Sequence, residues 1–148
     1  MSSMPNSLPG SIIDFLGDGT DSVEFRTPGN LKMPGFEISD KGSVTQLTSS
    51  TTAVTLNSKV GTITTVSQTL AAGGGVTFQF NNSYIGLSGN TVMLSCYYDG
   101  TGGVPLAVSS NETLGSMDIV IHNVDDVSTM DAPVRVHFWI IWLYDISV

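Results

Sequence analysis

Apolar and polar residues alternate with a period of two along much of the chain, as in the segment 76–80, where two polar residues separate three apolar ones. The segment 117–124 repeats the pattern, with Asp118 and His122 at polar positions. Successive side chains of a strand point to opposite faces, so this pattern predicts half-buried β-strands. The residues expected to face inward include Val76, Phe78, Phe80, Ile119 and Ile121.

The segment 42–65 is dense in Thr and Val, β-branched residues that suit a pleated sheet and fit poorly inside helices. Polar turn-forming residues interrupt it at Ser49-Ser50 and at Asn57-Ser58. We therefore expect three short strands with tight connections in this segment. A further strand is expected at 91–98, followed by a long turn that begins at the Asp99-Gly100 step.

The last predicted strand, 134–144, is apolar on both faces in its second half. One face holds Val134, Val136, Phe138, Ile140, Trp142 and Tyr144. The other face begins with the polar Arg135 and His137 and continues with Trp139, Ile141 and Leu143. Such a strand must be covered on both sides, and a contact between subunits is a good candidate for the second cover. The interface residues predicted on this basis are Phe138, Trp139, Ile140, Ile141, Trp142, Leu143 and Tyr144.

Apolar residues recur at helical spacing nowhere over eleven residues, whereas seven or more short strands are separated by frequent turn signals. This organisation predicts an all-β fold, a β-sandwich or jelly roll. The length of 148 residues is that of one domain. We divide the chain into an N-terminal arm and anchoring segment, 1–35, and a β-sandwich domain, 36–148.

The arm begins with a stretch, Met1–Gly10, that holds two prolines and small polar residues. A compact apolar cluster follows at 11–17, between two helix-breaking residues. The cluster is too short to bury itself, so we expect it to dock either on another protein or on its own domain. The anchoring residues predicted here are Ile12, Ile13, Phe15 and Leu16.

The charge balance is acidic, with thirteen Asp and Glu residues against five Lys and Arg, for a net charge of -8. Nucleic-acid binding depends on Lys and Arg neutralising phosphates, so contact with DNA or RNA is not expected. No window approaches eighteen apolar residues, and the start of the chain lacks the basic and apolar regions of a signal peptide. We therefore expect no membrane partner.

Groups that carry chemistry are sparse. Cys96, the only cysteine, lies in an apolar run and is expected to be a buried, inert thiol. His122 and His137 fall on separate predicted strands, and two histidines are too few to define a metal site. No nucleophile-elbow sequence accompanies them. The sequence thus predicts no catalytic residue, no metal and no cofactor.

The order of several short patterns resembles the trimeric β-domain of tailed-bacteriophage virion proteins, which occurs in head decoration (cement) proteins and in tail fibres or spikes. The residues that carry the resemblance are Gly42, Val44-Thr45-Gln46, Thr48-Ser49, Val54-Thr55-Leu56-Asn57, Gly61-Thr62-Ile63-Thr64, Leu70-Ala71-Ala72-Gly73, Val76-Thr77-Phe78, Asn82-Ser83, Val92, Ile121-His122-Asn123 and 132–138. The resemblance covers about the last two-thirds of the chain. It departs from the family pattern in the first thirty-five residues and in the extension beyond Phe138.

The resemblance implies a homotrimer with interlocked strands that sits on the surface of the phage head and binds the major capsid protein. The short arm and the lack of a long shaft favour a decoration protein over a fibre. The alternative is a receptor- or glycan-binding tip of a tail fibre, in which Tyr84, Tyr97 and Tyr98 stack on sugars instead of packing in the core. A small β-fold hydrolase is a third and weaker hypothesis.

Overall fold

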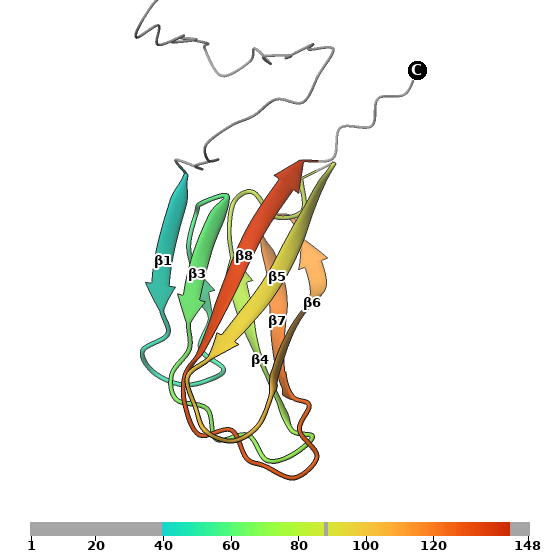
Figure 1. The fold of residues 1–148 in the computed structure, drawn as a ribbon. Coiled ribbons are helices and arrows are strands. Elements are labelled where there is room, and N and C mark those ends of the chain that lie inside the picture. Colours follow the sequence, from blue (N-terminus) through green and yellow to red (C-terminus); the bar gives the residue numbers. More distant parts are fainter. Residues whose placement is uncertain (1–39, 88, 143–148) are drawn as a thin grey trace, which may run out of the picture. The chain divides into compact units, whose positions relative to one another are not determined.

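The structure, a computed structural model, describes residues 40–87 and 89–142, and this part of the chain is all-β with no helix (Figure 1). One mixed sheet, sheet A, has the strand order β1-β3-β8-β5, and the other, sheet B, has the order β2-β4-β7-β6. The strands are β1 (Lys41–Thr45), β2 (Val54–Thr55), β3 (Val60–Thr64), β4 (Gly75–Asn81), β5 (Asn90–Tyr98), β6 (Pro105–Thr113), β7 (Ser116–Asn123) and β8 (Val134–Trp142). The predicted all-β fold class is confirmed.

The first four strands alternate between the two sheets. Strands β1 and β3 pair in parallel in sheet A, while β2 and β4 pair in parallel in sheet B. Parallel neighbours need a crossover connection, and here each crossover is a strand of the opposite sheet. The remaining pairs are antiparallel, including β5 with β8 and the β6–β7 hairpin. This alternation ties the two sheets together from the first strand onward.

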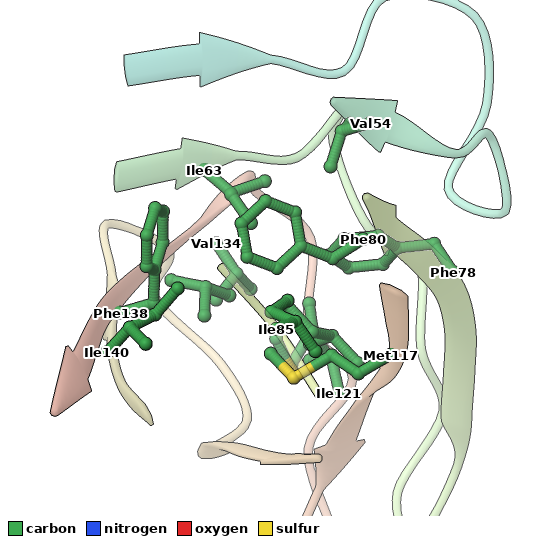
Figure 2. Packing of buried hydrophobic residues seen from close by; sticks show 13 residues of the cluster. Val54, Ile63, Phe78, Phe80, Ile85, Met117, Ile121, Val134, Phe138 and Ile140 are labelled. Atoms are coloured by element: carbon green, nitrogen blue, oxygen red, sulfur yellow. The ribbon is translucent and has the colours of Figure 1, made fainter. Parts of the chain in front are cut away.

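The core lies between the sheets and consists of one cluster of buried apolar side chains (Figure 2). Its centre is the contact of Phe80 from sheet B with Phe138 from sheet A, whose ring centroids lie 4.8 Å apart. The alternation predicted for β4 and β7 is confirmed. The cluster contains Val54, Ile63, Phe78, Phe80, Ile85, Met117, Ile119, Ile121, Met130, Val134, Val136, Phe138 and Ile140.

The three strands expected in 42–65 are present as β1, β2 and β3, and the strand expected at 91–98 is β5. Strand β6 was not expected, because its pattern lacks large inward residues. Its inward position Ala107 is small, and the larger Leu106 and Val108 face outward with exposed side chains. The segment after residue 103 therefore continues as a strand, and the expected long turn is shorter than the sequence indicated.

The loops at one end of the sandwich are joined by Asn123, whose side chain is 1% exposed. Its Nδ2 donates to the backbone oxygens of Leu70 and Ser128 at 3.1 and 2.7 Å, and its Oδ1 accepts from the backbone N–H of Val104 at 3.0 Å. Three loops thus share one buried amide, which satisfies their backbone groups where no strand pairing can do so.

The turn after β7 contains Asp125 and Asp126. The Asp125 carboxylate accepts hydrogen bonds from the backbone N–H groups of Ser128 and Val127 at 2.7 and 2.8 Å. These two bonds favour the charged form and lower the pKa of Asp125 below its usual value. The charged side chain of Asp125 therefore fixes the conformation of this turn.

Two glycines on the inward side of sheet A make room for the core. A Cβ atom at Gly61 would lie 2.7 Å from the ring of Phe138 and 2.8 Å from the backbone oxygen of Gly42. A Cβ at Gly42 would lie 2.7 Å from Cδ1 of Leu56. Side chains at these positions would push the aromatic core away from strands β1 and β3.

We expect Gly61→Ala to destabilise the protein by about 1–3 kcal/mol, because the methyl group overpacks the Phe138 site against a backbone atom that cannot move aside. Gly75→Ala is the matched control, since its Cβ would lie 2.9 Å from the imidazole of His122, which can rotate away, and at an ordinary 3.5 Å from the backbone oxygen of Ile121. Urea unfolding followed by circular dichroism measures both. Equal stability of the two variants would contradict this account of the core.

Candidate interaction face

The outward face of sheet A is built from four strands in register, so its side chains form rows across the sheet. An apolar row contains Val60, Trp139 and Met93, with Lys41 at its β1 end. The next row is polar and contains Ser43, Thr62, His137 and Ser95. The third row contains Thr45, Thr64, Arg135 and Tyr97.

A hollow of about 650 Å³ opens over the first two rows. Its apolar side is formed by Trp139 and Met93, which are 43% and 56% exposed, and by the half-buried Val60. The half-buried Ile141 extends this apolar surface one row further. A large aromatic side chain and a methionine that are this exposed at neighbouring positions indicate a binding surface.

The polar row supplies hydroxyl and imidazole groups that can form hydrogen bonds. His137 Nδ1 lies 3.0 Å from Thr62 Oγ1, and this hydrogen bond fixes the imidazole against strand β3. The hydroxyl-bearing Ser43 and Ser95 are exposed on either side of this pair. The hollow therefore combines apolar contact on one side with hydroxyl and imidazole groups on the other.

The face carries no acidic strand residue. None of the four strands of sheet A contains Asp or Glu, although the chain as a whole has a net charge of -8. The cations on this face are Lys41 and Arg135. The guanidinium of Arg135 pairs with Asp99 and lies 5.1 Å from the ring centroid of Tyr97. The strands of sheet A thus contribute no carboxylate to this outward surface, and Asp99, just after β5, pairs with Arg135 at its edge.

The structure separates the residues of the predicted interface into two groups. Phe138 and Ile140 are each 2% exposed and lie in the core of their own chain (Figure 2). Trp139 and Ile141 face outward. Strand β8 ends at Trp142, while Leu143, Tyr144 and the whole predicted arm with Ile12, Ile13, Phe15 and Leu16 lie outside the described residues, as does the predicted boundary at 35–36.

The three tyrosines proposed for sugar stacking have different surroundings. Tyr84 is half-buried, with Lys59 Nζ 5.6 Å from its ring centroid. Tyr98 is half-buried, and its hydroxyl donates to Asp131 Oδ1 at 2.7 Å. Burial raises the pKa of the Tyr98 phenol. Tyr97 is 52% exposed and lies at the edge of the face.

The residues whose side chains could carry out chemistry lie apart from one another. His122 belongs to sheet B and His137 to sheet A. Cys96 is half-buried, and its Sγ lies 3.4 Å from the backbone oxygen of Pro105. Within 40–87 and 89–142, no group of three His, Cys, Asp or Glu residues has the arrangement needed to hold a metal ion. What the outward face of sheet A offers is apolar contact and hydrogen bonding.

No model of a known family, no curated protein and no solved structure matches the chain. The described part of the chain also contains no helix long and apolar enough to span a membrane.

Sequence reasoning identified Trp139 and Ile141 but missed their neighbours. Val60 and Met93 come from strands 46 or more positions away, and they meet Trp139 only through the register of β3 and β5 with β8. The alternation within each strand indicates that Val60 and Met93 point outward. It does not indicate which strands are neighbours, so it could not predict that both lie beside Trp139.

Proposed function

We propose that this chain is a structural protein of a tailed-bacteriophage virion, a decoration protein that forms a homotrimer on the head and stabilises the shell. In this proposal the outward face of sheet A packs against other copies of the chain. The observation that carries it is the apolar character of that face, whose strands hold no acidic residue, with Trp139 and Met93 exposed side by side.

Composition supports self-association through this face. The cores of protein interfaces are enriched in aromatic residues, Met and Arg and depleted in Asp, Glu and Lys. Trp139, Met93 and Arg135 follow this preference, while Lys41, Ser43 and Ser95 lie on the edge strands β1 and β5. Copies of a chain with a net charge of -8 repel one another, so the surface that joins them needs few carboxylates, and sheet A has none in its strands.

The assignment to the head rests on the resemblance of 42–138 to phage virion domains and on the physical demands of that location. A decoration protein must remain folded outside a cell, and closed symmetric assembly gives stability without disulfides. Strands β1 and β5 are the edges of sheet A, and contacts between copies would protect such edges from unwanted pairing. The anchoring arm would then bind the major capsid protein.

One observation favours a second candidate, the receptor- or glycan-binding tip of a tail fibre. Pockets for small ligands are largely apolar with a few placed polar groups, and the 650 Å³ hollow has Trp139 beside His137, Ser43 and Ser95. A sugar ring stacked on Trp139 would reach these hydroxyl and imidazole groups. This candidate requires the face to stay open in the assembled protein, whereas the decoration proposal requires it to be covered.

Immunogold electron microscopy of virions distinguishes the two locations. With an antibody against the sandwich domain, we expect gold particles distributed over the head surface. Labelling confined to the tail tip would overturn the head assignment and favour the fibre candidate.

We expect Trp139→Asp to dissociate the trimer into folded monomers, because the interface would have to bury an unpaired carboxylate at a cost of several kcal/mol. The side chain of Trp139 points away from the core, so the fold should persist by far-ultraviolet circular dichroism. Native mass spectrometry at micromolar concentration measures the assembly.

Thr77→Asp is the matched control, since Thr77 is an exposed outward residue of sheet B and the substitution adds the same charge. It should leave the trimer intact. A trimer that survives Trp139→Asp unchanged would exclude sheet A as the contact between copies.

We expect deletion of residues 1–16 to leave the trimer folded and to weaken its attachment to heads, because the apolar residues Ile12 and Phe15 would no longer contact the shell. Co-sedimentation of the truncated protein with heads that lack the decoration protein measures the loss. Equal binding of truncated and full-length protein would show that the arm is not an anchor.

A further inference from the structure

A second exposed apolar surface lies on the outward side of sheet B. Five residues of strands β6 and β7 and their loop ends form it, and we call it the β6–β7 strip: Val104, Leu106, Val108, Val120 and Val124. Val104, Leu106, Val108 and Val124 are between 38% and 54% exposed, and Val120 is half-buried. The proposed contact between copies does not use this surface.

Strand pairing makes the strip continuous. Val108 lies opposite Val120, and Leu106 lies opposite His122. At the loop end, the backbone N–H of Val124 donates to the backbone oxygen of Val104 at 2.8 Å. Three successive cross-strand steps therefore place these apolar side chains next to one another, because facing residues of an antiparallel pair are direct neighbours.

The strip is held rigidly at its loop end. The buried side chain of Asn123 accepts from the N–H groups of Val104 and Asp125 at 3.0 and 3.2 Å. The same side chain donates to Ser128 in the following loop. Apolar side chains on such a fixed backbone lose little conformational entropy on binding, which is the condition for a preorganised docking surface.

Carboxylates flank the strip at both ends. Asp118 lies opposite Ser110, one outward position beyond the Val108–Val120 pair. Asp125 and Asp126 directly follow Val124 at the loop end. This surface is therefore apolar in the middle except for His122 opposite Leu106, and it carries carboxylates at each end, whereas the strands of sheet A hold none.

We propose that the β6–β7 strip is the surface that docks on the shell, and that its partner is a capsid subunit with an apolar patch flanked by Lys or Arg. This inference rests on the proposed function. A second copy of this chain does not fit, because pairing two strips in either direction brings Asp118 or Asp125 and Asp126 against carboxylates of the other copy, and like charges in contact disfavour association. A partner with Lys or Arg beside its apolar patch would instead form favourable charge pairs with Asp118, Asp125 and Asp126.

The test uses the full-length protein and phage heads that lack it. The double variant Leu106→Asn/Val108→Asn removes the apolar middle of the strip without adding charge. The matched control, Leu47→Asn, removes an apolar side chain that is 85% exposed in the loop after β1, away from the strip. Co-sedimentation with heads gives the affinities, and native mass spectrometry gives the assembly state of each variant.

We expect the double variant to bind heads about tenfold or more weakly than the unmodified protein, with its assembly state unchanged. The control should bind as the unmodified protein does. Asp126→Asn adds a test of charge: its affinity should fall less steeply with salt than that of the unmodified protein, because one charge pair is lost.

The outcomes separate the two proposals. Binding of the double variant at unmodified affinity overturns the strip as the shell contact while the decoration function stands. Loss of assembly in the double variant also overturns it, because the strip would then join copies of this chain. Failure of the unmodified protein to bind heads overturns the decoration function together with this inference.

Discussion

The contact between Phe80 and Phe138 is the interaction on which the rest of the structure depends. It joins the middle of sheet B to the middle of sheet A, and its rings lie 4.8 Å apart. Gly61 makes it possible, because any side chain there would occupy the place of the Phe138 ring. Once Phe138 points into the core, the alternation of a strand requires Trp139 to point outward.

The two outward surfaces follow from this arrangement and differ in charge. The strands of sheet A contain no acidic residue, so its apolar row around Trp139 suits contact between copies of an acidic chain. The strip on sheet B lies between Asp118 at one end and the pair Asp125 and Asp126 at the other, which suits a basic partner. The proposed decoration function requires one surface for other copies and one for the shell, and in this proposal the two outward faces of the sandwich serve these two roles.

The fold class and most of the strands could be predicted from the sequence, because strand periodicity is a local property. The alternation around Phe78 and Ile119 was sufficient to assign their inward faces. The pairing of distant strands could not be predicted, so the contact of Val60 and Met93 with Trp139 was missed. Phe138 and Ile140 were included in the predicted interface because the pattern shows only that both faces of the strand must be buried. It does not show which face packs against the other sheet of the same chain. Strand β6 was missed because its apolar residues face outward, which reverses the usual signal.

The central claim is that the outward face of sheet A is covered by other copies of the chain. Sedimentation equilibrium of the purified, unmodified protein at micromolar concentration tests it most directly, because the method reports mass without dependence on shape. The account predicts a single species with three times the chain mass of 15.6 kDa. A single species of 15.6 kDa would contradict it.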